Sequence, residues 1–513
     1  MKDMPGDELV LDGTTLTIDD VHSVSVGLRP VRISQTALTK LEVARKLVFE
    51  LAERDEPIYG FNRGVGWNKD RKVDANFFES YNRNLLLSHS AGVKPEANEY
   101  EVRAVMLARL NGLLLGHTGV QPLIAQRYAE FLNLGIHPVL PLRGSVGASD
   151  ITVISHIGLA LIGEGEVHVH GVRMPASAAL AQAGLAPISM GPKDGLAVVS
   201  SNALSAGLGA LGLYECRRML ELADMASALS LEALRGNLSP LDPAVHHVRP
   251  YAGQLESLGF IRSVLEASDL WGQQNSESLQ DPLSFRDACQ VNGAARDALS
   301  YAASRLETQL NSSDDNPCLL IEERRIISCA NFDPLVWVLG FEMLGSALYH
   351  VSRCSSYRTL KLGNPAFTGL TRFLTADESH SIGLCTVQKT VTSIDAEIRH
   401  LSNPASADYA SLAGDIEDHG TNAPYVVSKT REIVDRLCYV IAIELIHAAQ
   451  AIDLRGDIQL GRGTRAAYEA LREQVSFLSQ DRELTSDIER AYRICKDGSL
   501  LEKVRQAISG DEG

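Results

Sequence analysis

The sequence predicts a mainly α-helical protein with a smaller N-terminal part of mixed α and β structure. Two observations support this prediction. After Pro192, apolar residues recur at helical spacing through most of the chain. Before that point, shorter helical patterns are mixed with alternating segments and with loops rich in glycine and proline. We therefore expect an N-terminal α+β part over residues 1–190, and a central helical bundle with C-terminal helices over residues 191–513.

The N-terminal part begins with two patterns of different period. Alternating apolar and polar residues around Asp12-Gly13 predict a short hairpin. From Thr36 to Leu51 apolar residues recur at helical spacing, which predicts a helix that ends before Pro57. The other elements expected here are a second hairpin over 163–174 and helices over 77–90, 99–115 and 151–161.

The helical bundle is predicted from long amphipathic stretches, which span residues 203–233, 287–309, 335–360 and 425–452. The longest uncharged run, from Gly195 to Tyr214, has the length of a membrane span. It is rich in Gly, Ser and Ala and contains Asn202, so we expect a buried helix and no membrane insertion.

Composition narrows the class of protein. The 513 residues carry a net charge of −16, spread along the chain, and such a surface repels nucleic acid and anionic membranes. The eight cysteines show neither CxxC pairs nor Cys/His metal spacing, so we expect no disulfide framework and no metal. The N-terminus, MKDMPGDELV, is too polar and acidic for a secretory signal, and we expect a cytoplasmic protein.

Chemistry is expected in the polar loops between the helices, because loops carry functional residues on a rigid scaffold. Each loop alone has an ordinary explanation. The segment 311–317 is compatible with a helix cap, and Tyr59 with a half-buried core tyrosine. The acidic and histidine residues at 417–419 make a poor metal site, because adjacent residues on a helix point in different directions.

Taken together, these loops form an ordered set of motifs. In chain order they read YGFNRGVG, NLLLSHSAGV, GSVGASD, KDGLAVVSSN, QDPLSFR, NSSDDNP, ANF and IEDHG. Their order and spacing resemble the histidine and phenylalanine ammonia-lyase family, from about Tyr59 to beyond His419. The resemblance implies long antiparallel helices in a central bundle, and a homotetramer whose active sites each take residues from several subunits. The site residues that it implies are Tyr59, His89, Arg286, Phe332 and Glu417.

The chain departs from the family where the family makes its electrophile. Family members carry methylidene-imidazolone, formed when the glycine nitrogen of Ala-Ser-Gly attacks the alanine carbonyl, and glycine permits that close approach. Here the sequence is Ala148-Ser149-Asp150, so the simplest alignment deletes the glycine. Leu283 replaces a tyrosine of the family, and Ser200 replaces an asparagine. We therefore expect the electrophile to be absent and the protein to use no cofactor.

One position carries a new charge. Lys389 falls where the family usually has an apolar or small residue. A lysine that faces the inside of a bundle is costly unless it is paired or used. Lys389 is therefore either a catalytic or binding cation near Glu417, or a surface residue if the helical register differs. We favour the first interpretation.

The loss of the electrophile indicates a class of substrate. In the amine-adduct mechanism, the electrophile needs a nitrogen with a free lone pair. A quaternary ammonium has none, and a trialkylamine leaves as a neutral molecule without prior activation. With Lys389, this logic resembles a member of the family that removes trimethylamine from the betaine of a thiolated histidine. The resemblance implies such a small-molecule substrate for this chain.

The roles at the reacting atoms follow from this resemblance. Tyr59 is expected to remove the β-proton as general base. Because a phenol has an ordinary pKa of about 10, nearby positive charge from Arg63 or Lys389 must lower it. Arg286 is expected to hold the substrate carboxylate, preferably in a bidentate contact, and Asn202 to assist there.

Further residues are expected around the substrate ring. Glu417 accepts a hydrogen bond from the imidazole N–H, and Lys389 pairs with the thione sulfur and stabilises negative charge in the ring. His89 and Phe332 flank the ring. Phe332 or Tyr59 faces the trimethylammonium through a cation–π contact.

Two other functions are compatible with the sequence. One is a conventional histidine or aromatic amino acid ammonia-lyase, with an electrophile made from residues 148–150. The other is a catalytically silent paralogue that kept the fold. Against the silent paralogue, Tyr59, His89, Arg286, Phe332 and Glu417 are all retained with their motifs.

Overall fold

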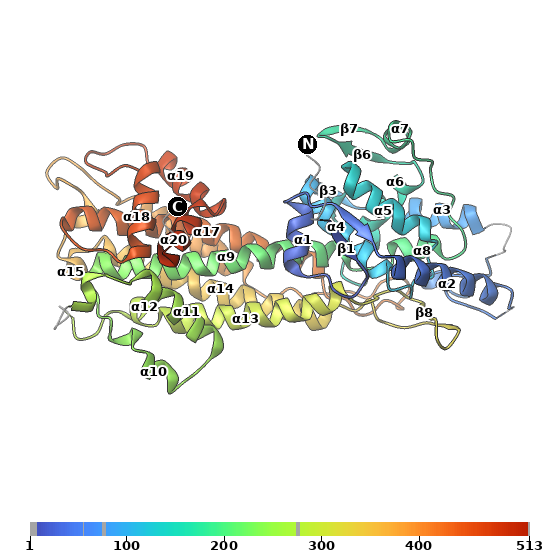
Figure 1. Cartoon of the computed structure of the whole chain (residues 1–513), viewed down its shortest axis with the longest axis horizontal. Helices are drawn as coiled ribbons and strands as arrows, with labels where there is room; N and C mark the ends of the chain where they lie inside the picture. The colour runs from blue at the N-terminus through green and yellow to red at the C-terminus, as the bar shows by residue number, and fades with distance from the viewer. Residues whose placement is uncertain (1–7, 55, 74–77, 273–277, 511–513) are drawn as a thin grey trace. The chain divides into compact units, whose positions relative to one another are not determined.

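The computed structural model describes residues 8–54, 56–73, 78–272 and 278–510, and the chain divides into two units (Figure 1). Unit 1 holds residues 1–214, 302–341 and 404–428, and unit 2 holds residues 215–301, 342–403 and 429–513. Most of the dividing points fall inside the long helices α9 (Ala203–Leu234), α13 (Ala288–Leu310), α14 (Leu335–Leu362) and α17 (Ala423–Arg455). The units therefore do not part at residues 190 and 191, because helices beyond that point contribute to both.

The hairpin predicted around Asp12-Gly13 is wrong. The strands β1 (Leu9–Leu11) and β2 (Val31–Ile33) pair in parallel, and helix α1 (Ile18–Ser25) lies between them in the sequence. The Thr17 side chain accepts the Asp20 N–H, and the Asp20 carboxylate accepts the Thr17 N–H. This capping box starts a helix where the alternating pattern suggested a second strand.

The described part of unit 1 also contains antiparallel sheets. They are β3 (Val93–Glu96) with β5 (Pro141–Arg143), β4 (Ile136–Pro138) with β6 (Glu166–Val169) and β7 (Val172–Pro175), and β8 (Cys318–Leu320) with β9 (Arg325–Ile327). The β6–β7 pair confirms the hairpin predicted over residues 163–174.

Helices make up the rest of unit 1. They are α2 (Gln35–Ala52), α3 (Phe78–His89), α4 (Glu99–Leu113), α5 (Pro122–Leu134), α6 (Ile151–Leu161), α7 (Ala176–Gln182), α8 (Asp194–Val199) and the 3-10 turn η1 (Gly66–Asn68). The helices predicted from Thr36 and over 99–115 and 151–161 are confirmed, and α3 confirms the described part of the one predicted over 77–90. Helix α2 buries Leu47 and Leu51 against Phe61 of the glycine-rich loop, which fixes one end of that loop.

Unit 2 is almost entirely helical. Besides its share of the long helices, it contains η3 (Ser239–Leu241), α10 (Pro243–His247), α11 (Ala252–Val264), η4 (Asp269–Gly272), α12 (Leu283–Arg286), α15 (Pro365–Thr368), η5 (Arg372–Leu374), α16 (Val387–Leu401), α18 (Arg462–Gln474), α19 (Thr485–Lys496) and α20 (Ser499–Ser509). The mainly helical fold class and the long predicted helices are thus confirmed.

The long helices pack through polar as well as apolar contacts. Helices α9 and α13 run antiparallel: Asp224 of α9 binds Arg296, whereas Gly209, earlier in α9, faces Leu306, later in α13. Helices α14 and α17 run in the same direction. Near the start of this pair Glu342 binds Lys429, and further along both helices Arg358 binds Glu444.

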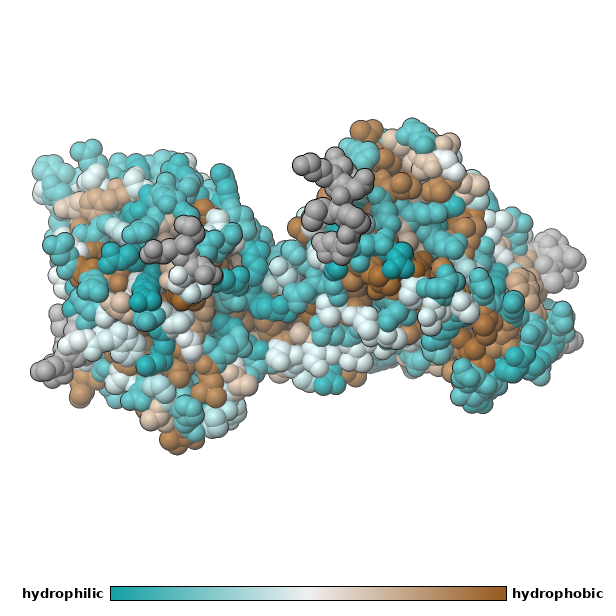
Figure 2. Space-filling model, in the orientation of Figure 1, coloured by the Kyte–Doolittle hydropathy of each residue, from teal (hydrophilic) through white to brown (hydrophobic). Residues whose placement is uncertain are grey.

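Within the part of the chain that the structure describes, three segments are long and apolar enough to cross a bilayer, by length and composition alone. They are Asp194–Leu234, Leu335–Leu362 and Ala423–Arg455, and the apolar windows of these segments are 100%, 50% and 83% buried within the chain. On the face drawn in Figure 2, hydrophilic side chains cover most of the surface of each unit. The burial of Asp194–Leu234 agrees with the buried helix predicted for the uncharged run.

Candidate active site

The glycine-rich loop of residues 58–68 folds back on itself and presents Tyr59. The Ile58 carbonyl accepts the N–H groups of Asn62 and Arg63, both at 3.2 Å. Gly60 has a φ of +63°, and a Cβ at this position would lie 2.1 Å from Leu196 Cδ2, so only glycine fits. The returning chain brings the Gly66 N–H to 2.9 Å from Tyr59 Oη, and the phenol oxygen accepts that hydrogen bond.

The electrostatic surroundings of Tyr59 differ from the prediction. Burial raises the pKa of the Tyr59 phenol, and the nearby Glu417 carboxylate raises it further, while the Gly66 N–H opposes the shift. Arg63 does not supply the expected positive charge: its guanidinium donates to the Asn62 carbonyl at 3.0 Å, and it is not among the residues that line the cavity described below. A cation that activates Tyr59 must therefore come from elsewhere.

The loop Gly144–Asp150 is held in place by its backbone. The Val146 carbonyl accepts the N–H groups of Thr421, at 3.2 Å, and of Asn422, at 2.8 Å. Ser149 has a φ of +61°, a left-handed conformation that is uncommon for a residue with a side chain. Ala148 and Ser149 both line the cavity.

Asp150 closes this loop and is fully buried. Its N–H donates to the Ser201 carbonyl at 2.7 Å, and its carbonyl accepts the first N–H groups of α6. One carboxylate oxygen accepts both the N–H and the Oγ–H of Ser205, each at 2.9 Å, near the N-terminus of α9. Burial raises the pKa of the Asp150 carboxyl to about 7. Both the backbone and the side chain of Asp150 are thus committed to joining two helix starts.

Glu417 lies in the loop between α16 and α17. Leu412 and Glu417 exchange backbone hydrogen bonds of 2.8 and 3.3 Å, which close a short turn. The half-buried Glu417 side chain lines the cavity on the side of Gly66. Its neighbour His419 pairs with Asp333 at 3.1 Å, and among the described residues no group of three His, Cys, Asp or Glu side chains is placed to hold a metal ion.

These loops enclose a cavity of about 560 Å³ within unit 1. Its lining comprises Tyr59, Val65, Gly66, Trp67, Asn68, Lys69, His89, Ala148, Ser149, Ile151, Leu196, Val199, Ser200, Asn316, Ser328, Cys329, Phe332, Ala413, Ile416 and Glu417. The predicted residues Tyr59, His89, Phe332 and Glu417 therefore converge on one space. His89 Nδ1 lies 2.8 Å from the Leu85 carbonyl; in the neutral tautomer that donates there, Nε2 is left as an acceptor.

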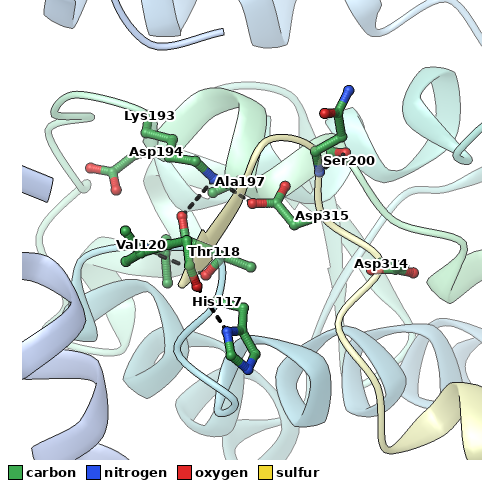
Figure 3. Close-up of polar contacts among 12 residues, drawn as sticks. His117, Thr118, Val120, Lys193, Asp194, Ala197, Ser200, Asp314 and Asp315 are labelled. Carbon is green, nitrogen blue, oxygen red and sulfur yellow. Dashed lines mark hydrogen bonds and ion pairs between the residues drawn. The ribbon is translucent and has the colours of Figure 1, made fainter. Parts of the chain in front are cut away.

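A buried ion pair supports the floor of this cavity. Lys193 is 1% exposed and donates to the Thr118 carbonyl at 2.7 Å and to the Asp315 carboxylate (Figure 3). This contact ties the start of α8 to the segment that contains Asn316. The Asn316 N–H in turn donates to Ser200 Oγ at 3.3 Å, so two lining residues are held together.

Asn202 lies beneath the cavity and does not line it. Its amide nitrogen donates to the Phe332 carbonyl, and its backbone N–H donates to Asp314 at 2.8 Å. Contact between Asn202 and the substrate carboxylate therefore stays a prediction, and in this structure Asn202 does not line the cavity. Instead, Asn202 binds the Phe332 carbonyl, and Leu196, Val199 and Ser200 are the residues of its motif that line the cavity.

Arg286 and Lys389 belong to unit 2 and do not line the cavity. Arg286 is half-buried at the end of α12, next to the exposed Leu283. Lys389 lies on the exposed face of α16, whose buried face carries Val391 and Ile398. The expectation that Lys389 points into the bundle is thus wrong for the single chain, because α16 follows a register that turns it outward.

Several lining residues were not singled out from the sequence. Trp67, Asn68 and Lys69 follow the glycine-rich motif directly, and Ser328 and Cys329 precede the ANF motif. Their nearness to these motifs was the available signal. The direction of their side chains depends on turns that the motifs alone do not specify.

Comparisons with known proteins agree over nearly the whole chain. A family model described as aromatic amino acid lyase matches residues 16–473. Histidine ammonia-lyase from Gloeobacter violaceus is 38% identical over 504 residues, with 98% of each chain covered.

Solved structures give the same picture. Ergothionase from Treponema denticola, in complex with desmethyl-ergothioneine sulfonic acid, is 45% identical with a TM-score of 0.94, covering 96% of this chain and 100% of that chain. Histidine ammonia-lyase from Trypanosoma cruzi is 27% identical with a TM-score of 0.90, covering 98% of this chain and 95% of that chain.

Proposed function

This chain belongs to the aromatic amino acid lyase family, and from that premise we propose that it eliminates trimethylamine from ergothioneine to give thiourocanate. Its membership and its class, a carbon–nitrogen lyase, confirm what the ordered motifs predicted. The similarity to ergothionase at 45% identity supports the specific substrate. The names of the sequence relatives favour histidine ammonia-lyase as the second candidate.

The surroundings of Asp150 carry the proposal. An electrophile made from Ala148-Ser149-Asp150 would need the Asp150 nitrogen to attack the Ala148 carbonyl. That nitrogen donates instead to Ser201, and the Asp150 carboxylate is tied to Ser205. Ring closure would break the hydrogen bond from this nitrogen to the Ser201 carbonyl, so we infer that these residues do not fit the electrophile. We propose that the protein works without methylidene-imidazolone or any other cofactor.

A quaternary ammonium suits such a site because it leaves as neutral trimethylamine. In our proposal, Tyr59 removes the β-proton. The free phenol has a raised pKa, so its base form is scarce until positive charge is near. The substrate's own ammonium, bound on the carbon next to the one that loses the proton, supplies that charge. A substrate-borne cation thus replaces the one expected from Arg63.

In our proposal the ring is bound in the same cavity. Glu417 accepts the imidazole N–H, and His89 and Phe332 flank the ring. We propose that Arg286 holds the carboxylate and Lys389 the thione sulfur, and that both come from neighbouring subunits. In this arrangement the exposed position of Lys389 suits a residue that serves another chain's site.

A homotetramer with shared active sites is therefore part of the proposal. On the exposed side of α14, Met343 and Tyr357 are 45% and 43% exposed and lie close to one face of the helix. A second copy packed on this face would cover them.

We further propose a cytoplasmic protein that binds neither nucleic acid nor membranes, in keeping with its net charge of −16.

One assay tests the function directly. Purified protein is incubated with ergothioneine, and trimethylamine is measured together with the absorbance of the conjugated acrylate product. Release of both products is expected. If the protein releases ammonia and urocanate from histidine and no trimethylamine from ergothioneine, it is a histidine ammonia-lyase, the second candidate. If it gives no product from ergothioneine, histidine, tyrosine or phenylalanine, it is a silent paralogue.

Intact mass tests the missing electrophile separately. Formation of methylidene-imidazolone removes two waters from the chain. We expect the mass of the unmodified sequence, with Ser149→Ala, which has no hydroxyl to lose, as a matched control whose mass changes by the substitution alone. A mass lower by two waters would contradict the proposal even if trimethylamine were released.

A further inference from the structure

Trp67 is the largest side chain of the cavity lining that the proposed chemistry does not yet use. It follows Gly66, whose N–H binds the Tyr59 phenol, and it lines the same cavity as Tyr59 and Glu417. Its side chain is 72% exposed. A single exposed apolar residue is common on protein surfaces and does not by itself indicate a binding site. The contacts that hold the Trp67 ring are therefore needed to assign it a role.

The backbone at Gly414 packs against one face of the Trp67 ring. A Cβ at Gly414 would lie 2.9 Å from Cδ2 and 3.0 Å from Cε2 of Trp67, so the indole rests directly on the Gly414 backbone. Gly414 also has a φ of +64°, which disfavours any other residue there. One face of the indole is thus covered by the Gly414 backbone, and most of the remaining side chain is exposed.

Trp67 lines the same cavity as Tyr59, and this indicates the class of ligand. The proton that Tyr59 removes and the departing nitrogen are on adjacent carbon atoms, so the ammonium must lie close to the phenol. Trp67 is the next residue after the one that binds this phenol. Glu417, which also lines the cavity, adds negative potential. A quaternary ammonium has no N–H to donate, so an aromatic face is the surface that attracts it.

We propose that Trp67 is a specificity-determining residue that receives the quaternary ammonium of the substrate on its open face, an inference that rests on the proposed function. The attraction needs positive charge, and the departing trimethylamine is neutral. Trp67 therefore stabilises the bound substrate more than the transition state. Its loss should raise KM and should raise kcat rather than lower it.

The test compares Trp67→Leu and Trp67→Phe with Phe49→Leu. Phe49 is a half-exposed aromatic residue outside the cavity, with Arg45 over its ring at 4.9 Å. For Trp67→Leu we expect roughly a tenfold rise in KM for ergothioneine and a similar loss of affinity for tetramethylammonium as a competitive inhibitor. Trp67→Phe should change the KM for ergothioneine and the affinity for tetramethylammonium by less. Phe49→Leu should have the same KM and the same affinity as the unaltered protein.

A neutral probe separates charge from packing. Choline and its uncharged isostere 3,3-dimethylbutan-1-ol have nearly the same shape. Trp67→Leu should weaken the binding of choline more than the binding of the alcohol. An equal loss of affinity for the two probes, or an unchanged KM for ergothioneine, would overturn the role of Trp67. If the unaltered protein releases no trimethylamine yet binds tetramethylammonium through Trp67, the proposed function fails and the ammonium subsite stands.

Discussion

Tyr59 is in a local environment that makes the reaction depend on pH in a defined direction. Burial and Glu417 raise the pKa of its phenol in the free protein. The base form therefore increases with pH, and kcat/KM should rise through the neutral and alkaline range. A bound quaternary ammonium favours the phenolate. The rise of kcat with pH should therefore occur at lower pH than the rise of kcat/KM. Steady-state rates measured across pH give both profiles.

Substitution of Tyr59 gives the matching prediction. Tyr59→Phe should abolish elimination and leave the Kd for ergothioneine within a few-fold, because only the proton acceptor is lost. Tyr128→Phe is the control, since it removes a fully buried hydroxyl for which the described structure provides no hydrogen-bond partner. Substantial turnover by Tyr59→Phe would remove Tyr59 from the mechanism.

Asp150 links pH to stability. Burial raises its pKa from 3.8 to about 7, so the folded protein binds more protons than the unfolded one between these values. Its contribution to stability therefore falls as pH rises through this window. Asp150→Asn cannot ionise, and its Tm relative to the unaltered protein should increase from pH 5 to pH 8. Thermal unfolding at both pH values measures the change.

Asp12 offers a control, because its pKa is shifted in the opposite direction to that of Asp150. Hydrogen bonds from Thr14 lower the pKa of its carboxyl, so it stays ionised from pH 5 to pH 8. The Tm difference for Asp12→Asn should be the same at both values. A constant difference for Asp150→Asn as well would show that its carboxyl does not titrate in this range.

At the residue scale, the motifs predicted which loops form the cavity better than which side chains enter it. Tyr59, His89, Phe332 and Glu417 converge as expected. Arg63 and Asn202 do not line the cavity. Arg63 follows Gly60, where the loop turns at a positive φ, and Asn202 is bound to Phe332 and Asp314. Such dihedral angles depend on tertiary packing, which the sequence motifs do not contain.

Among the elements, helix α12 depends on a buried ion pair. Arg358 of α14 and Glu444 of α17 are both fully buried and bound at 2.5 Å, and Arg358 also donates to the Ser284 carbonyl at 2.8 Å. This contact fixes the short helix that ends at Arg286. Arg358 is thus a positioning residue for the proposed carboxylate-binding arginine.

Loss of this pair should affect both stability and substrate binding. Arg358→Met leaves the Glu444 carboxylate buried without its partner, which should cost roughly 3–5 kcal/mol. It should also raise KM more than it lowers kcat, because Arg286 is displaced. Arg436→Met, which removes a half-buried pair with Glu397, should cost less than about 1 kcal/mol. Similar losses of Tm for the two variants would contradict this role.

The prediction of elements succeeded where a pattern was long. Helix α6 begins and ends where its apolar pattern predicted, at Ile151 and Leu161. The N-terminal alternation was too short to identify its partner: β1 pairs with β2, which lies beyond α1. The sequence did contain a signal, since Thr17 and Asp20 have the spacing of a capping box.

For the whole molecule, the division into units differs from the boundary predicted at residues 190 and 191. The long helices pass through the dividing points, so segments far apart in sequence belong to one unit. Contacts of this kind depend on the path of the chain, whereas composition changes only along the sequence. The same division assigns the cavity to unit 1, and Arg286 and Lys389 to unit 2.

This separation leads to a prediction about assembly. If Tyr59 and Lys389 of one site come from different subunits, two inactive variants can complement each other. Tyr59→Phe and Lys389→Met tetramers, each inactive alone, should regain activity when the two chains are co-expressed and assemble at random. Equal amounts should give about a quarter of the sites with both residues intact.

The alternative arrangement predicts a different outcome. If both residues of a site came from one chain, every mixed site would lack one of them, and co-expression would restore nothing. Mixtures of Tyr59→Phe with Tyr59→Phe/Lys389→Met chains are the control, because no site in them has an intact base. Activity in the first mixture and none in the control would establish that the sites are shared, and it would explain how an exposed Lys389 contributes to catalysis.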